Sequence, residues 1–283
     1  MAEALVRGVR INYQIVGNAG PGIAFTPGSR RAFAELVPLA EHIARFGYRI
    51  LLHDRRNCGA SEVAIEPLGA EHEIYADDLR ALAEQVGFDQ IYIGGPSAGA
   101  RLALLFALRH PTASKGLLLW RLTGGSHAAT ELAEAYYGMY ITLAERGGMQ
   151  AVCESEHFVA CIRARPSNRQ RLMQMDPADF IQTMEMWRAS FLAASDLPVI
   201  GATEEDLGRL KIPVCLIAGN DVIHSPVTAR KFAKIVRQTE LHDDVVEKRS
   251  DDDLLAEWSP SEWRSVEPRM ASIFGEFLDR CKN

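Results

Sequence analysis

Apolar and polar residues change their spacing several times along the first 120 residues. Short apolar runs alternate with stretches in which apolar residues recur every three or four positions, the spacing of a helix face. The runs predict a hairpin at 5–16 and buried strands at 22–26, 48–53, 90–94 and 116–120, and the helical stretches lie at 33–44, 71–86 and 100–108. This alternation predicts an α/β fold with a mostly parallel central sheet flanked by helices.

The pattern changes between residues 124 and 207. This segment has helical spacing and no convincing strand, and it contains most of the methionines. Strand and helix alternate again from 212 to 246, and a helical pattern at 267–278 ends the chain. We therefore predict a core made of residues 1–123 and 208–283, with residues 124–207 inserted as a helical cap over one end of the sheet.

Composition narrows the classes of partner. Of 283 residues 47% are hydrophobic and 24% are charged, which excludes disordered and fibrous proteins. A net charge of −6 argues against nucleic acid as a partner, and no apolar run is long enough to cross a membrane. Five scattered cysteines and no secretory signal favour reduced thiols in a cytoplasmic protein. We expect a small-molecule substrate, no cofactor and no metal; the oligomeric state stays open.

The strongest chemical signal is the segment Gly95–Gly99, which has the form G-x-S-x-G. It follows the predicted strand 90–94 and begins a helical stretch. A sharp strand-to-helix turn of this kind lifts a serine hydroxyl above the sheet, and its glycines allow the backbone to turn tightly. Ser97 is therefore a candidate nucleophile.

At this point the chain resembles the α/β-hydrolase fold superfamily over nearly its whole length. The segment 54–61 is similar to the superfamily's loop after the second core strand, with Asn57 where glycine is usual. Thr26–Ser29 stands where the superfamily carries its oxyanion loop, so the resemblance implies an oxyanion hole formed by the backbone N–H groups of Ser29 and Ala98. The turn 218–221 matches the one that supplies the acid, which would be Asp221.

The third member of the expected Ser–acid–His triad is missing from its usual place. Aligned on the apolar pair Leu254–Leu255, the superfamily's histidine becomes Asp253. A serine hydroxyl needs a positioned base. Two candidates remain: His224, three residues after Asp221, and Asp253 itself, although acidic runs such as 251–253 are often only solvated loops. His242 would lie inside the last strand and is more typical of a structural residue.

Geometry follows from these assignments. We expect Ser97 and Asp221 to face one another across a pocket, with no histidine in the usual position between them and Asp253 nearby. Of the histidines after the acid, His224 should lie closest to Ser97, and as the base it would be within hydrogen-bond reach.

The cap is expected to line the pocket with methionine, tyrosine and tryptophan side chains. Candidate substrate-binding residues are Trp120 and Arg121, where a core strand ends, and Tyr136 and Trp187 in the cap. Cys153, His157 and Cys161 have the spacing of one helical face and lack a fourth ligand, so a packed helix is favoured over a zinc site.

These residues favour a serine-dependent hydrolase acting on a small ester, lactone or cleavable C–C bond. The missing late histidine leaves an alternative, namely a lyase-like or dehydratase-like enzyme, or a ligand-binding protein with the same fold and an incomplete triad.

Overall fold

The computed structural model describes residues 2–193, 195, 197–247 and 260–282. Within these residues eight strands form one sheet in the order β1-β2-β4-β3-β5-β6-β7-β8. The strands are β1 (Ala2–Val6), β2 (Val9–Val16), β3 (Gly22–Phe25), β4 (Arg49–His53), β5 (Ile91–Pro96), β6 (Ser114–Trp120), β7 (Val214–Ile217) and β8 (Thr239–His242). β1 and β2 are antiparallel to their neighbours, and the other pairs are parallel. The hairpin turns at Arg7–Gly8, earlier than the hydrophobic pattern indicates, because both residues adopt positive φ angles there.

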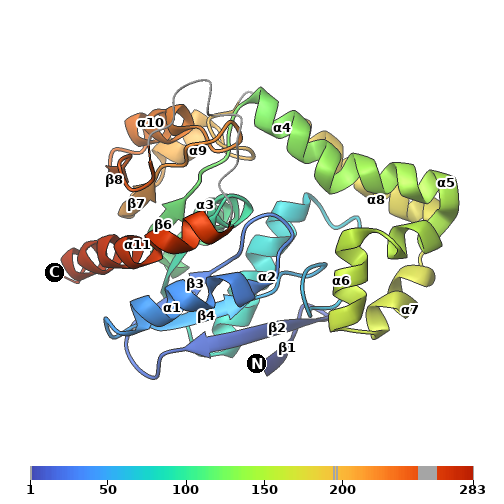
Figure 1. The fold of residues 1–283 in the computed structure, drawn as a ribbon, viewed down its shortest axis with the longest axis horizontal. Coiled ribbons are helices and arrows are strands. Elements are labelled where there is room, and N and C mark those ends of the chain that lie inside the picture. The colour runs from blue at the N-terminus through green and yellow to red at the C-terminus, as the bar shows by residue number, and fades with distance from the viewer. Residues whose placement is uncertain (1, 194, 196, 248–259, 283) are drawn as a thin grey trace.

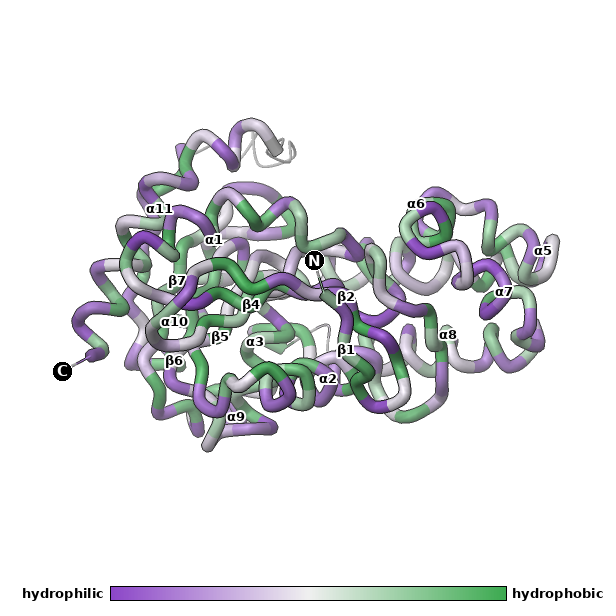
Figure 2. Tube along the Cα trace, turned by 90° about the horizontal axis from the view of Figure 1, so that it is seen from below, coloured by the Kyte–Doolittle hydropathy of each residue, from purple (hydrophilic) through white to green (hydrophobic). Residues whose placement is uncertain are grey.

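Two apolar layers cover the sheet. On one face pack α2 (Glu71–Gln85), α3 (Ala98–Arg109), α9 (Glu204–Gly208) and α10 (Pro226–Ile235), and on the other α1 (Val37–Ala44) and α11 (Pro260–Arg280). Figure 1 shows α1 and α11 side by side across one face. Parallel strands covered on both faces are apolar throughout, and in Figure 2 the hydrophobic colour follows the central strands.

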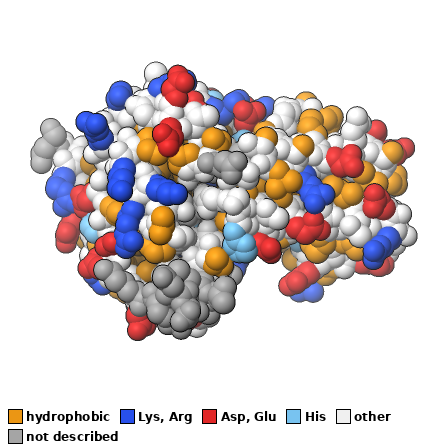
Figure 3. All heavy atoms as spheres, turned by 90° about the horizontal axis from the view of Figure 1, so that it is seen from above, with side chains coloured by type: hydrophobic (Ala, Val, Ile, Leu, Met, Phe, Trp, Pro, Cys, Tyr) orange, Lys and Arg blue, Asp and Glu red, His pale blue; other side chains and the backbone are white. Residues whose placement is uncertain are grey.

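The segment after β6 is a helical insertion that extends away from the sheet (Figure 1). It contains α4 (Ser126–Ala133), a π-helical turn η3 (Glu134–Gly138), α5 (Met139–Cys153), α6 (Glu156–Ala164), α7 (Ser167–Met173) and α8 (Pro177–Leu192). Seen from above it is a lobe beside the core with hydrophobic side chains on its surface (Figure 3). A long helical insertion is thus confirmed, and the boundaries 124 and 207 stay a prediction. No helix among the described residues is long and apolar enough to span a bilayer.

Candidate active site

Ser97 lies in a strained turn between β5 and α3. Its φ of 54° is in a region that side chains other than glycine rarely adopt. The flanking glycines are required sterically, because a Cβ on Gly95 or Gly99 would lie 2.2 Å or 2.0 Å from the carbonyl oxygen of Thr26. The end of β3 therefore passes directly beneath the serine turn, and this close approach sets the place of the hydroxyl.

A second turn, after β7, carries Asp221 and His224. The Asp221 carboxylate accepts the backbone N–H groups of Ile223 and His224 at 3.0 Å and 2.8 Å, which folds the chain back on itself. Ser225 then caps α10, where Pro226 occupies the first turn. Gly219 gives His224 its space, since a Cβ there would lie 2.3 Å from the His224 carbonyl oxygen and 2.5 Å from its Cβ.

The two turns meet in a continuous chain of hydrogen bonds. The His224 Nε2 atom lies 2.9 Å from Ser97 Oγ, and Nδ1 lies 2.9 Å from both carboxylate oxygens of Asp221. All three residues are buried. The expectation that no histidine would occupy the usual position between Ser97 and Asp221 is therefore wrong, because the chain after Asp221 turns back and brings His224 to Ser97. His224 lies within the hydrogen-bond reach of Ser97 that was expected of it as a candidate base. Asp253, the other candidate base, is outside the described residues.

Charge around the acid favours its ionised form. Burial raises the pKa of Asp221, but the hydrogen bonds and charge of His224, with a further contribution from Arg121, outweigh it and hold the pKa below its ordinary value. Arg121 Nη2 lies 3.5 Å from Asp221 Oδ2 and 3.3 Å from His224 Nδ1. The guanidinium also lies 5.0 Å from the centre of the Trp263 ring. Arg121, predicted to bind substrate, thus contacts the acid and the histidine.

The loop after β3 runs beside the serine. A Cβ on Gly28 would lie 3.5 Å from the Ser97 Cβ, so this loop is in contact distance of the turn. Ser29 has a φ of 43°, and its carbonyl oxygen accepts a hydrogen bond from Arg55 Nη2. Ala98 is the first residue of α3, directly after Ser97. Ala98 is therefore part of the serine turn, and Ser29 directly follows the loop residue that contacts it.

A cleft of about 780 Å³ opens between this loop and the cap. The core contributes Ser29, Phe33 and the 54–60 loop, and the cap contributes Tyr136, Met139 and Tyr140. Ser29, the candidate oxyanion residue, is part of its lining, and Ser97 is not.

The predicted aromatic lining is only partly found. Trp187 is buried inside the cap, where it packs against Tyr137 and donates to the Gly69 carbonyl oxygen at 2.9 Å. Trp120 packs between Phe25 and Phe274 and borders a separate cavity of about 80 Å³. Of the four candidate substrate-binding residues, Tyr136 is the one that lines the large cleft.

Cys153, His157 and Cys161 do not share one helix, contrary to the spacing argument. Cys153 ends α5, and α6 begins at Glu156 after an extended Ser155. His157 Nε2 lies 2.7 Å from the carbonyl oxygen of Asn57, to which the Cys161 thiol also donates at 3.7 Å. These two side chains therefore attach α6 to the core loop.

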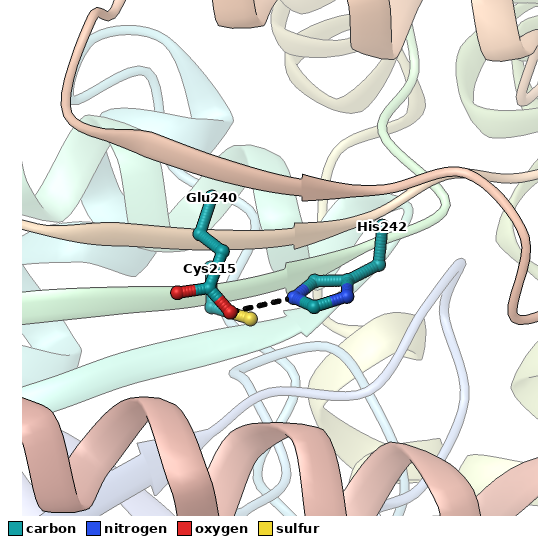
Figure 4. A group of neighbouring side chains, drawn as sticks. All are labelled: Cys215, Glu240 and His242. Carbon is teal, nitrogen blue, oxygen red and sulfur yellow. Dashed lines mark hydrogen bonds and ion pairs between the residues drawn. The ribbon is translucent and has the colours of Figure 1, made fainter.

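One further cluster was not found from the sequence. Cys215, Glu240 and His242 come from neighbouring strands, and their ligand-type atoms lie within 4.8 Å of one another (Figure 4). Glu240 is already paired with Arg280, at 2.6 Å, and with His242, at 2.8 Å. Burial raises the pKa of the Cys215 thiol well above its usual range. A carboxylate neutralised by arginine next to a protonated thiol is a poor donor set for a metal ion. The signal available in the sequence was the spacing of Glu240 and His242, which are two residues apart and therefore lie on the same face of a strand; the pairing with Cys215 comes only from the sheet register.

Comparison with known proteins agrees with this architecture. Residues 20–119 match a family model described as alpha/beta hydrolase fold. An uncharacterized hydrolase, YraK, from Bacillus subtilis is 31% identical over 106 residues, which are 38% of each chain. Epoxide hydrolase 2 from Siraitia grosvenorii is 29% identical over 115 residues, 39% of this chain and 35% of that one. These alignments span little more than a third of the curated relatives.

Solved structures are similar over almost the whole chain. A meta-cleavage product hydrolase from Pseudomonas fluorescens IP01 has a TM-score of 0.67 at 17% identity and covers 99% of this chain and 98% of its own. The enol-lactonase from Burkholderia xenovorans LB400 has a TM-score of 0.62 at 17% identity and covers 98% of this chain and 100% of its own. The chain has the α/β-hydrolase fold with a long helical insertion, so the fold class predicted from the sequence is confirmed.

Proposed function

We propose that this protein is a serine-dependent hydrolase acting on a small carbonyl compound, an ester, a lactone or a cleavable C–C bond. Ser97 is the nucleophile, His224 its general base and Asp221 the residue that orients the base. The observation that carries the proposal is the buried chain from Ser97 Oγ through the His224 ring to the Asp221 carboxylate, with 2.9 Å at each link.

Each contact has a chemical role in this mechanism. The ionised Asp221 holds the Nδ1–H tautomer of His224, which leaves Nε2 free to accept the Ser97 proton. The serine oxygen attacks the substrate carbonyl, and the backbone N–H groups of Ser29 and Ala98 stabilise the oxyanion that forms. His224 then donates its proton to the leaving group, and water releases the acyl group by the reverse sequence.

The base and the acid come from one short turn, so this mechanism needs no base from residues 248–259. Variants of His224 and of Asp253 can therefore show which of the two is the base. We expect the intact protein to hydrolyse p-nitrophenyl acetate and to react with a fluorophosphonate probe at Ser97. Ser97→Ala and His224→Ala should each lower kcat/KM by about 10⁴-fold or more, because the two groups act as a unit.

Asp253→Asn and His242→Ala are the control variants for Ser97→Ala and His224→Ala. Asp253→Asn should keep kcat/KM within a few-fold of the parent, and His242→Ala should do the same because this histidine is paired with Glu240. A large loss in Asp253→Asn with little change in His224→Ala would transfer the role of base to Asp253. An intact protein that neither hydrolyses the ester nor reacts with the probe would support the non-hydrolytic alternative.

A further inference from the structure

Arg30 directly follows Ser29, and its side chain is buried between core and cap. Only 8% of the side chain is exposed, and its Nη2 atom lies 2.9 Å from the carboxylate of Glu71, the first residue of α2. The same Nη2 donates to the carbonyl oxygen of Tyr136 at 3.2 Å. Arg30 therefore connects three parts of the molecule. Its backbone belongs to the loop of Ser29, and its guanidinium contacts the core at Glu71 and the cap at Tyr136.

Glu71 is shared in the same way. It accepts the hydroxyl of Tyr75, from its own helix, at 2.7 Å and the hydroxyl of Tyr137, from the cap, at 2.9 Å. Burial raises the pKa of Glu71, but the charge of Arg30 and the two hydroxyl groups outweigh it, so the pKa is lowered. The carboxylate thus stays charged and joins Arg30 to both lobes.

Aromatic rings complete the surroundings of this cation. The guanidinium carbon of Arg30 lies 5.6 Å, 5.7 Å and 5.9 Å from the ring centres of Tyr136, Tyr137 and Tyr140. All three rings belong to the π-helical turn and the start of α5 in the cap. Stacking of this kind stabilises a buried cation and depends on the cap being seated.

A second arginine holds the other side of the strained loop. Arg55 donates to the Ser29 carbonyl oxygen, and its guanidinium lies 5.3 Å from the centre of the Tyr75 ring. Tyr75 in turn donates to Glu71, the partner of Arg30. The positive φ of Ser29 is strained for a residue other than glycine and persists only where surrounding contacts enforce it. Here the enforcing contacts form a closed circuit around Ser29.

We propose that Arg30 is a positioning residue that couples the seating of the cap to the geometry of the oxyanion loop. With the cap in place, Tyr136 and Tyr137 hold Arg30 and Glu71, and this pair together with Arg55 keeps the Ser29 N–H directed at the serine turn. When the cap moves, Arg30 loses its contact with Tyr136 and Glu71 loses its contact with Tyr137, and the backbone of Ser29 leaves its strained conformation. The inference rests on the proposed hydrolase function, in which Ser29 supplies an oxyanion donor.

Tyr137→Phe is the sharpest test, because it removes only the hydroxyl that links the cap to Glu71. We expect kcat for p-nitrophenyl acetate to fall about 5-fold to 20-fold with KM nearly unchanged, since an oxyanion donor acts in the transition state. The double variant Arg30→Met with Glu71→Gln removes the pair without leaving a buried charge. It should lower kcat by about 10²-fold, the loss expected for one oxyanion donor.

Three further variants separate positioning from a structural role. Arg30→Lys keeps the charge toward Glu71 and should recover part of the kcat lost in the double variant. Tyr48→Phe, a buried tyrosine of the α1–α11 layer, should leave kcat unchanged. Circular dichroism and melting temperature identify folded variants, and only these are compared.

Two results would overturn the coupling. One is an unchanged kcat in folded Tyr137→Phe and in the folded double variant; the other is a rise in KM alone, which would make Arg30 a substrate-binding residue. If Ser97→Ala stays fully active, the hydrolase proposal itself is wrong; if Ser97→Ala is inactive and the Arg30 and Tyr137 variants are normal, only the coupling is wrong.

Discussion

The candidate catalytic edge of the core, where Ser97 and His224 meet, and the seam, where the cap contacts the core loop 57–69, are built by different physical means. At the catalytic edge, backbone segments approach so closely that only glycine fits, at Gly95 and Gly99 under the serine turn and at Gly219 beside His224. At the seam, cap side chains donate to backbone carbonyls of one core loop. His157 contacts Asn57, Arg165 contacts Ala60 at 2.7 Å, and Trp187 contacts Gly69.

This difference determines how each region responds to change. A close backbone approach is either possible or not, so a single added methyl group at the edge displaces whole residues. Hydrogen bonds at the seam can be removed one at a time, and each removal takes one donor from a carbonyl of this loop, at a cost of about 1–3 kcal/mol where the carbonyl is buried. The edge should therefore lose activity abruptly, and the seam should lose stability by increments.

Outside the chain of Ser97, His224 and Asp221 itself, the largest expected effect is at Gly219. Alanine at this position would place a Cβ 2.3 Å from the His224 carbonyl oxygen, so the turn must move and take the imidazole with it. We expect kcat for p-nitrophenyl acetate to fall about 10²-fold to 10³-fold, as displacements of about 1 Å do at other active sites.

Gly208→Ala is the matched control for this prediction. No atom lies within 4 Å of a Cβ added there, so activity and melting temperature should stay close to the parent values. Equal kcat values for Gly219→Ala and the parent would contradict the steric account of the catalytic edge.

Asn168 gives the largest expected effect on the seam. Its fully buried amide accepts from the Val63 N–H at 2.9 Å and donates to the carbonyl oxygens of Ser61 and Cys161 at 3.0 Å and 3.3 Å. Asn168→Ala removes all three bonds and should lower the free energy of unfolding by about 3 kcal/mol, measured by urea denaturation. The exposed Asn18→Ala serves as control, and a loss no larger than that of the control would contradict the role given to the seam.

His157 should make the seam sensitive to acid. Burial and the charge of Arg30 lower its pKa from 6.5 to about 4, so the unfolded chain binds this proton first as the pH falls. The contribution of His157 to the free energy of unfolding is therefore complete above about pH 6.5 and is lost progressively as the pH falls toward 4. This group alone should make unfolding easier by about 2 kcal/mol at pH 5 than at pH 8.

His157→Gln keeps a donor for the Asn57 carbonyl and removes the titration. Urea denaturation at the two pH values should therefore show about 2 kcal/mol less acid sensitivity in this variant than in the parent. His127→Gln, at an exposed position of α4, should leave the difference between the two pH values unchanged. Identical pH dependence in His157→Gln and the parent would mean that the pKa of His157 is the same in the folded and the unfolded chain, and would contradict this prediction.

The elements of the core follow from hydrophobic periodicity, because a strand covered on both faces must be apolar throughout, as β5 and β7 are. The serine turn also follows from local sequence, because its glycines mark a tight strand-to-helix turn. For the base the sequence left two candidates, His224 and Asp253. It could not decide between them, because the contact between His224 and Ser97 joins residues 127 positions apart and depends on the backbone of Gly219. Arg30 was not singled out from the sequence, since nothing in a pattern of charges shows that Glu71 and three cap tyrosines will surround it.

The smallest expected effect concerns the group Cys215, Glu240 and His242, where neither a backbone clash nor a buried donor is involved. Glu240 and Arg280 form a partly exposed ion pair at the edge strand β8, and such pairs contribute about 1 kcal/mol or less. Glu240→Gln should therefore lower the melting temperature by no more than a few degrees, and excess EDTA should change neither melting temperature nor ester hydrolysis.

Added Zn²⁺ would have to displace Arg280 and deprotonate the Cys215 thiol, whose pKa is raised by burial. We therefore expect no stabilisation at micromolar zinc. A melting temperature that rises with zinc in the parent, and not in Glu240→Gln, would instead make this cluster a metal site on the far edge of the sheet.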